Sequence, residues 1–271
     1  MKEKNYKTIQ YKIEGRVAKL VLNRPQVHNA FNSTMISEML DVLKKIQDDA
    51  SIRIVVLTGN GKSFCAGADL NWMREVIDYS YDQNLKESLD IAEFLYNLYS
   101  IPKPTIAKVN GAAIGGGVGF LSACDIVLAS SNAQFGLSEV KIGLIPAAIS
   151  PYVVKRIGES KAREYFLTGE RISAERGEQI GLVNHAVPAE LLEQETEKTV
   201  DRLLSSGPNA IANCKKLLFK VPQVSLKEAQ ELTARMIADL RISDEGQEGM
   251  AAFLEKRKPN WVLNIKSEKN V

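Results

Sequence analysis

Residues 105–123 read TIAKVNGAAIGGGVGFLSA, and this stretch decides the fold class. Its β-branched run Thr105–Val109 predicts a buried strand, which Asn110-Gly111 brings to an end. Small residues follow as far as Gly116, where we expect a short helix to begin and to continue to Ala123. A strand that passes through a glycine-containing turn into a helix is typical of α/β proteins.

The sequence on either side repeats this alternation of strands and helices. Residues 53–58 (RIVVLT) form a second β-branched run, which ends at Gly59, and 84–99 has the apolar spacing of a helix. Together with 105–109 these segments predict a βαβ crossover. A third extended segment is expected at 126–129, so strands and helices alternate through the first two-thirds of the chain.

The two ends of the chain have different patterns. Residues 9–22 alternate apolar and polar side chains around Gly15, which predicts a hairpin, and 33–50 has helical periodicity with Asn32 or Ser33 as N-cap. Beyond Val183 the pattern becomes helix upon helix, with helices expected over 188–204, 208–219, 226–240 and 244–256. We therefore predict two domains, an α/β core over 1–200 and a helical region over 201–271.

Composition excludes several classes of protein. Apolar residues make up 45% of the 271 residues and charged residues 25%, which is ordinary for a globular chain. A formal net charge of +2 does not indicate nucleic acid or an anionic membrane as partner. Three cysteines without paired spacing and an N-terminus without an apolar leader favour a reducing compartment, so we expect a cytoplasmic protein.

Several familiar motifs fail on inspection. Gly61-Lys62-Ser63 resembles the end of a phosphate-binding loop, but Val56 stands where that motif has its first glycine. The triple glycine at 115–117 lacks the third glycine of a dinucleotide fingerprint, because Phe120 occupies that position. The two histidines, His28 and His185, have neither metal-ligand spacing nor an obvious nucleophile nearby. We therefore predict neither a metal site nor a cofactor.

Two glycine-containing turns remain, each directly after a predicted buried strand. The first is 59–70 (GNGKSFCAGADL) and the second is 110–117 (NGAAIGGG). Small residues allow a ligand to approach the main chain, and a helix that begins near Gly116 would direct unpaired N–H groups at it. Either turn alone is an ordinary strand-to-helix connection, but two amides from neighbouring strand ends can form an oxyanion hole.

These residues carry a family resemblance that covers nearly the whole chain. The chain resembles the crotonase, or enoyl-CoA hydratase/isomerase, superfamily in five segments. These are Leu22-Asn23-Arg24-Pro25 with Asn29-Ala30, the run Ser63–Leu70, Val109-Asn110-Gly111 with the triple glycine and Cys124-Asp125, Phe135-Gly136 leading to Glu139, and the closing run Glu248–Arg257.

The resemblance implies a fold, a substrate and a set of roles. The fold would be a spiral of ββα units with a C-terminal helical region, assembled as a homotrimer or a dimer of trimers. The amides of Ala68 and Gly116 would bind the oxygen of an acyl-CoA thioester, which is a substrate rather than a cofactor. The residues that would border CoA are Ala66, Ala68, Asp69, Leu70, Asn71 and Gly116, with Phe253 and Lys256 contributed to a neighbouring subunit.

By the same resemblance, Glu139 would move the protons. Protons beside a thioester carbonyl are weakly acidic, and each amide donor of an oxyanion hole contributes about 3–4 kcal/mol to stabilising the enolate. If Glu139 faces an apolar pocket, burial should raise its pKa; the alternative is a surface carboxylate beside Lys141. Many hydratases of the family have a second glutamate where this chain has Gly119.

The departure at Gly119 leaves more than one function open. Together with 144–153 (LIPAAISPYV), it resembles the branch that hydrates methyl-branched, glutaconyl-type thioesters, as in methylglutaconyl-CoA hydratase of leucine degradation. We therefore expect a hydro-lyase of the enoyl-CoA hydratase type. A single glutamate is also typical of Δ3-Δ2 enoyl-CoA isomerases. A third hypothesis, a non-catalytic acyl-CoA- or RNA-binding protein, has only the basic clusters 215–216 and 256–258 in its favour.

Overall fold

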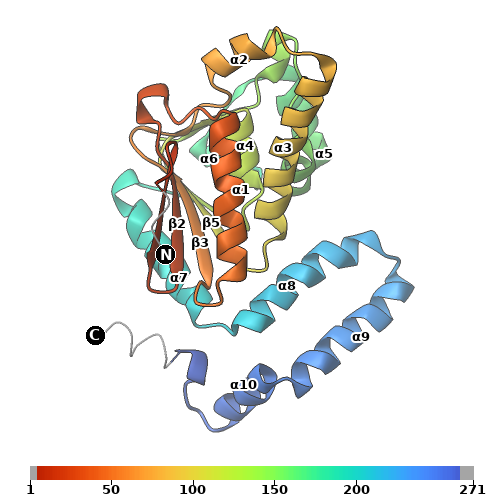
Figure 1. Ribbon diagram of the computed structural model, residues 1–271. Helices are drawn as coiled ribbons and strands as arrows, with labels where there is room; N and C mark the ends of the chain where they lie inside the picture. Colours follow the sequence, from red (N-terminus) through yellow and green to blue (C-terminus); the bar gives the residue numbers. More distant parts are fainter. Residues whose placement is uncertain (1–4, 263–271) are drawn as a thin grey trace.

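The main sheet has six strands, in the order β1-β2-β3-β5-β7-β10 (Figure 1). A computed structural model describes residues 5–262. The strands are β1 (Ile9–Glu14), β2 (Val17–Leu22), β3 (Ile54–Gly59), β5 (Thr105–Val109), β7 (Ile126–Ser130) and β10 (His185–Val187). Strand β1 pairs with β2 in the antiparallel sense, which confirms the predicted hairpin, and the remaining neighbours are parallel.

A second, four-stranded sheet follows the order β4-β6-β8-β9. Its strands are β4 (Ser63–Cys65), β6 (Ala112–Ile114), β8 (Gln134–Gly136) and β9 (Arg171–Ser173). Each strand of the parallel run β3, β5, β7 is followed by a three-residue strand of this second sheet and then by helical structure. This repeated unit is the expected ββα spiral, so the predicted fold class is confirmed.

Helices surround the two sheets and continue beyond them. They are α1 (Ser33–Asp48), α2 (Leu70–Val76), α3 (Tyr81–Ser100), α4 (Gly116–Ser122), α5 (Ser150–Thr168), α6 (Ala174–Gln179), α7 (Leu192–Leu204), α8 (Pro208–Lys220), α9 (Leu226–Ile242) and α10 (Asp244–Leu254). Short 3-10 turns lie at Pro25–Val27, Glu139–Ile142, Ala189–Leu191 and Val221–Gln223. Within residues 5–262 no helix combines the length and apolar character needed to span a bilayer.

Local sequence explains where the first long helix begins. The side chain of Asn32 accepts a hydrogen bond from the N–H of Met35 at 3.0 Å, so Asn32 is the N-cap of α1. The apolar residues of α1 recur at helical spacing and face the core, in agreement with the predicted helix. The buried set is Met35, Ile36, Met39, Val42, Leu43 and Ile46.

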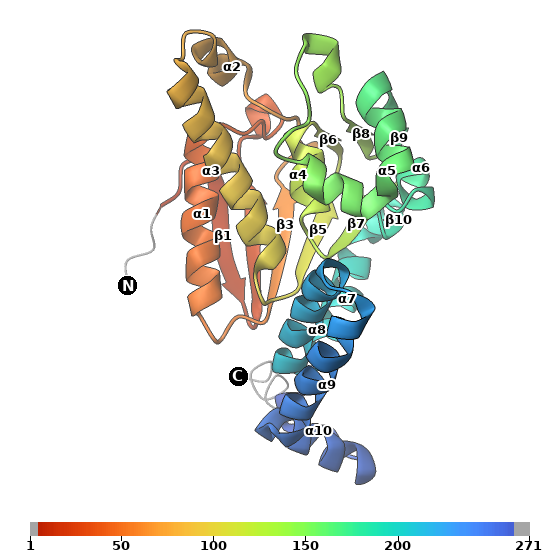
Figure 2. The ribbon, with the colours of Figure 1, turned by 90° about the vertical axis from the view of Figure 1, so that its right-hand side faces the viewer.

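The core lies between the main sheet and the helices α1, α3 and α4 (Figures 1 and 2). Helix α4 is buried from Gly117 to Ser122, and the ring of Phe120 packs against Phe31 and Phe94 with centroids 5.2 and 5.0 Å apart. The other face of the sheet is covered by α7, which contributes Leu192 and Leu204 to a smaller apolar cluster. Helix α4 is thus held rigidly, which fixes the position of its first residue.

The helical region extends away from the sheets (Figures 1 and 2). Residue 200, the predicted end of the first domain, lies within α7, which packs on the sheet and ends at Leu204. The helices expected over 208–219, 226–240 and 244–256 correspond to α8, α9 and α10. Their division from the core as a domain of their own stays a prediction.

Candidate active site

The first glycine turn brings Ala68 alongside Phe31. These two residues form an isolated parallel bridge, in which Phe31 N–H donates to the Gly67 carbonyl and Asp69 N–H donates to the Phe31 carbonyl, both at 2.8 Å. The N–H of Ala68 itself makes no hydrogen bond within residues 5–262. The first predicted oxyanion donor is therefore held by its neighbours and left available to a ligand.

An ion pair fixes the far side of this turn. The guanidinium of Arg24 lies 2.6 Å from the Asp69 carboxylate and also donates to the Ala30 carbonyl at 2.6 Å. Asp69 accepts from Asn71 N–H at 2.8 Å and so caps α2. Desolvation opposes ionisation, but the hydrogen bonds from Asn71 and Arg24 hold the pKa of Asp69 below its usual range. The Asp69 side chain is thus committed to holding the turn.

Asn29 joins the same turn to the end of β3. Its fully buried side chain donates to the carbonyls of Asn60 and Ser63 at 2.9 and 2.8 Å, and it accepts from Arg24 N–H. Its φ of 57° is left-handed, a conformation that asparagine tolerates better than most residues. Arg24, Asn29 and Phe31 received no role from the sequence, although the first two belong to the motif that carried the family resemblance.

The second turn presents Gly116 as the first residue of α4. Gly115 has a φ of 52°, and its N–H donates to the Gly136 carbonyl of β8 at 2.8 Å. The N–H of Gly116 has no acceptor within the described residues, and the positive end of the α4 dipole lies there. This is the second predicted donor, in the state that anion binding requires.

The two turns touch each other. A methyl group added to Gly116 would lie 2.4 Å from Cε1 of Phe31, the residue that is bridged to Ala68. One added to Gly117 would lie 2.4 Å from the carbonyl oxygen of Cys65. Glycine is required at both positions, because a side chain at 116 would meet the Phe31 ring and one at 117 would meet the main chain of Cys65. The structure thus brings the Ala68 and Gly116 segments together.

Glu139 lies beside this pair of turns. It begins the 3-10 turn Glu139–Ile142, and a methyl group added to Gly115 would lie 3.1 Å from its Oε1. Its Oε2 is buried without a hydrogen-bond partner among the described residues. Desolvation raises the pKa of Glu139, against a smaller opposing contribution from its own backbone N–H. Glu139 is therefore a half-buried carboxyl next to the second amide; the Lys141 side chain lies elsewhere, against Gly169.

The position of the missing second glutamate is filled by a neighbour. A methyl group added to Gly119 would lie 2.0 Å from Cγ2 and 2.7 Å from Cβ of Ile149, the residue that immediately precedes α5. Ile149 is 4% exposed. The segment 144–153 therefore supplies a packed side chain at this point, and any second carboxylate from residue 119 would require Ile149 to move.

The remaining predicted CoA contacts are more dispersed. Ala66 donates its N–H to the His28 carbonyl at 3.0 Å and lies in the first turn, and the side chains of Leu70 and Asn71 are exposed at the start of α2. Phe253, 83% exposed, lies in α10, and Lys256 follows that helix. Figures 1 and 2 place α10 at the opposite end of the molecule from α2, so these two residues are not near Ala68 within one chain.

Other candidate side chains have structural roles. Trp72 is buried, and its indole N–H donates to Glu87 at 2.8 Å, so it anchors α2 to α3. Burial raises the pKa of the Cys65 thiol to about 12, in line with a packing residue. His28 contacts Ser63 Oγ at 3.0 Å through Nδ1.

Comparison with known proteins identifies the class to which this site belongs. The family model described as enoyl-CoA hydratase/isomerase matches residues 12–264. A Thermus thermophilus protein named as an enoyl-CoA hydratase is 35% identical over 248 residues, which cover 92% of this chain and 98% of that protein. The 2,3-dehydroadipyl-CoA hydratase of Escherichia coli is 33% identical over 251 residues, with 92% and 96% covered.

A solved structure agrees with these sequence matches. The crystal structure of an enoyl-CoA hydratase/isomerase (crotonase) from Legionella pneumophila superposes with a TM-score of 0.89 at 44% identity, covering 94% of this chain and 98% of that one. The spiral of ββα units is thus the crotonase fold. The chain belongs to the enoyl-CoA hydratase/isomerase family, which confirms the expectation of an enzyme of this type.

Proposed function

We propose that this enzyme adds water across the 2,3 double bond of an enoyl-CoA thioester. The observation that carries the proposal is the pair of unpaired amides at Ala68 and Gly116, with the half-buried carboxyl of Glu139 beside the second one. The amides would donate to the thioester oxygen, on which negative charge grows as the enolate forms. The carboxyl of Glu139 would then transfer protons at the carbon atoms next to that thioester group.

Glu139 would act alone as general base and then general acid. In its ionised form it takes a proton from water while the water oxygen bonds to C3, and the electron pair of the double bond moves toward the thioester oxygen. The protonated carboxyl then returns that proton to C2, so that one water is added in total. Burial raises the pKa of Glu139, which favours the protonated form that returns the proton in the second step.

For the acyl group we propose a methyl-branched, glutaconyl-type thioester. Gly119 with the packed Ile149 distinguishes this pocket from that of two-glutamate hydratases, and the segment 144–153 was the basis for the resemblance to the methylglutaconyl-CoA branch. The E. coli relative is named for a carboxylated enoyl thioester, which supports a carboxylated acyl chain here. Methyl-branched specificity would follow from the shape of the wall that Ile149 provides.

The test is a substrate panel with product identification. Straight, methyl-branched and carboxylated enoyl-CoA thioesters are incubated with the purified enzyme, and the loss of enone absorbance is followed. The masses of the products are then determined by mass spectrometry. Gain of one water supports hydration, with the highest kcat/KM expected for the methyl-branched glutaconyl thioester. Conversion of a 3-enoyl to a 2-enoyl thioester without a change of mass would instead show isomerisation by the single glutamate.

Substitution of Glu139 tests the proposed role directly. Glu139→Gln keeps the size of the side chain and removes proton transfer, so kcat should fall about 10²–10⁴-fold while binding of a CoA thioester stays within a few-fold. Glu190→Gln, at an exposed glutamate of the 3-10 turn Ala189–Leu191, is the matched control and should leave kcat unchanged. Near-normal turnover by Glu139→Gln would remove Glu139 from the mechanism.

We also propose that a second subunit completes the CoA site. Phe253 and Lys256 lie at the far end of the molecule from Ala68, and the apolar side chains of Phe253 and Leu254 are 83% and 78% exposed. In a homotrimer or a dimer of trimers, α10 of one subunit would cover the site of the next. Sedimentation analysis tests the assembly, and Phe253→Ala or Lys256→Ala should raise KM more than it lowers kcat. A fully active monomer would contradict this arrangement.

A further inference from the structure

A cavity of about 740 Å³ lies where α8 meets the core, and it contains none of the residues placed in the candidate active site. Its wall is built from the end of α3, the link between α4 and β7, one face of α5, the segment between α6 and β10, and one face of α8. Helix α4 runs from Gly116 at the active site to Ser122 at this cavity. The volume is that of a typical small-molecule site.

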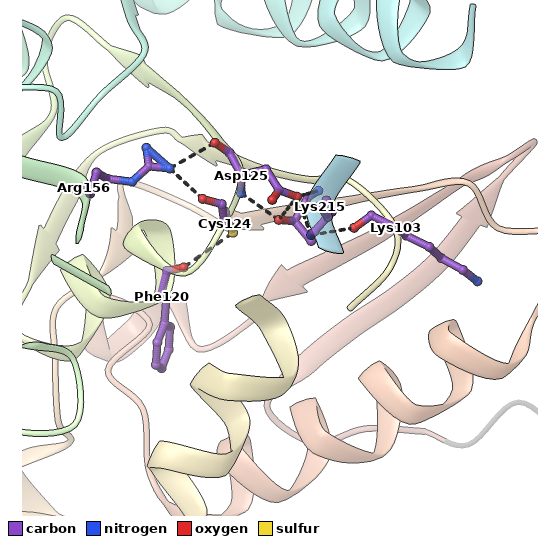
Figure 3. A network of polar contacts seen from close by, with 7 residues as sticks. Lys103, Phe120, Cys124, Asp125, Arg156 and Lys215 are labelled. Carbon is purple, nitrogen blue, oxygen red and sulfur yellow. Dashed lines mark hydrogen bonds and ion pairs between the residues drawn. The ribbon is translucent and has the colours of Figure 1, made fainter. Parts of the chain in front are cut away.

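The cationic side of the wall begins with Arg156 of α5. Its guanidinium donates to the carbonyls of Cys124 and Asp125 at 2.6 and 3.2 Å, and Figure 3 shows it directed at this stretch of main chain. Burial lowers the pKa of Arg156, as expected for a desolvated cation. The Asp125 carboxylate is already paired with Lys215 at 2.6 Å, so the charge of Arg156 is only partly balanced.

Lys155 adds a second cation that no carboxylate neutralises among residues 5–262. Its ammonium lies over the rings of Tyr99 and Phe219, 5.2 and 5.5 Å from their centroids. Lys216 also lines the cavity, so the wall carries four cationic side chains against one carboxylate. Two further rings line the same space, those of Tyr96 and Tyr152.

Ser122 supplies a second, independent observation at this cavity. It lines the cavity at the end of α4, it is 4% exposed, and its Oγ is buried with no hydrogen-bond partner in the described part of the chain. A helical serine ordinarily donates to the carbonyl one turn earlier. A buried hydroxyl without a partner is costly and uncommon in native proteins, unless a ligand or an ordered water satisfies it.

We propose that this cavity binds an organic anion with an aromatic body. The anionic group would face Lys155 and Arg156 and accept from Ser122, and the aromatic body would pack among the tyrosine and phenylalanine rings. The site is separate from the acyl-CoA site and does not depend on the reaction proposed for it.

Calorimetry with naphthoate tests the chemistry, and naphthylmethanol serves as its neutral counterpart of similar size. Naphthoate should bind the full-length wild-type protein saturably, with one site per chain, and at least tenfold more tightly than the alcohol. Lys155→Met keeps the length of the side chain and should weaken naphthoate about tenfold. Lys86→Met, at an exposed lysine of α3 outside the cavity, removes the same charge and should have no effect.

Ser122→Ala separates a ligand role from a structural one. Without ligand the variant should be at least as heat-stable as the wild type, because a buried hydroxyl without a partner has been removed, yet it should bind naphthoate several-fold more weakly. A saturating CoA thioester should not displace naphthoate. The proposal is overturned if naphthoate fails to bind, if the alcohol binds equally well, if CoA competes, or if the variants at 122 and 155 bind like wild type.

Discussion

The contact between Gly119 and Ile149 allows a prediction in which one substitution has opposite effects in two backgrounds. In the wild type, the Cβ of Gly119→Ala would lie 2.0 Å from Cγ2 of Ile149, whereas carbon atoms in contact are about 3.5–4.0 Å apart. An overlap of about 1.5 Å cannot be accommodated in a close-packed core without displacing α4 or α5. We expect Gly119→Ala to destabilise the protein by about 1–3 kcal/mol.

In an Ile149→Gly background, Gly119→Ala should instead stabilise the protein. Removing the Ile149 side chain takes away the atoms at 2.0 and 2.7 Å and leaves its Cα at 3.7 Å, which is an ordinary contact. Alanine is favoured over glycine within a helix by about 0.5–1 kcal/mol, and this advantage then remains. The two effects differ in sign, so the double-mutant cycle should give a coupling energy of about 1.5–4 kcal/mol.

Urea unfolding followed by circular dichroism measures the free energy of unfolding of the four proteins of the cycle, which are the wild type, the two single variants and the double variant. One fixed protein concentration is used throughout, because self-association would make apparent stability depend on concentration. Leu226→Ala serves as the control, since Leu226 is 89% exposed on α9 and should add to Ile149→Gly within about 0.3–0.5 kcal/mol. If Gly119→Ala changes the free energy of unfolding by the same amount and in the same direction in both backgrounds, Ile149 does not fill the space beside Gly119.

Three further predictions concern the turns and the carboxyl. Asp69→Asn keeps the cap of α2 but loses the ion pair with Arg24, so its free energy of unfolding in urea should fall by about 3 kcal/mol. Asp69→Ala also loses the cap and should fall by about 1 kcal/mol more. If both variants are as stable as the wild type, the ion pair does not stabilise the turn. Burial raises the pKa of Glu139 in the folded state above its unfolded value of about 4.3. The free energy of unfolding of the wild type, relative to that of Glu139→Gln, should therefore be most favourable below a pH of about 4.3 and should decline as the pH rises through the folded pKa. A relative stability that grows with pH would contradict this sign. Gly116→Ala should lower kcat, because its methyl group meets the Phe31 ring at 2.4 Å, and Phe31→Leu in the same chain should restore part of it; the absence of either effect would show that the ring does not hold the second amide in place.

The long elements were predictable because their periodicity extends over many residues. The strand Thr105–Val109, the N-cap Asn32 and the helices α8 to α10 all follow from local patterns of side chains. Strands β4, β6 and β8 have three residues each, too few for an alternation of side chains to be visible. From the residues alone β4 and β6 were hidden inside the two glycine-containing turns, and β8 was too short to recognise. Only the family resemblance implied a second strand in each unit.

The site was predictable to the extent that it depends on the main chain. Glycine at 116 and 117 reflects the close approach of two turns, and this requirement is visible in the sequence as a cluster of small residues. That Ile149 fills the space beside Gly119 could not be predicted, because the two residues are thirty positions apart and only tertiary packing joins them. The cavity at the end of α4 was missed for the same reason, since its wall comes from five separate segments.

The pairing of β4, β6 and β8 has a consequence for how this chemistry can be lost or gained. Ala68 follows β4, Gly116 follows β6 and Glu139 follows β8, so each group of the proposed active site belongs to a different coil of the spiral. No coil alone contains all three groups, so the proposed active site requires three successive coils to be stacked in register. A single-residue insertion or deletion in one short strand would leave a folded spiral whose three groups no longer face a common point.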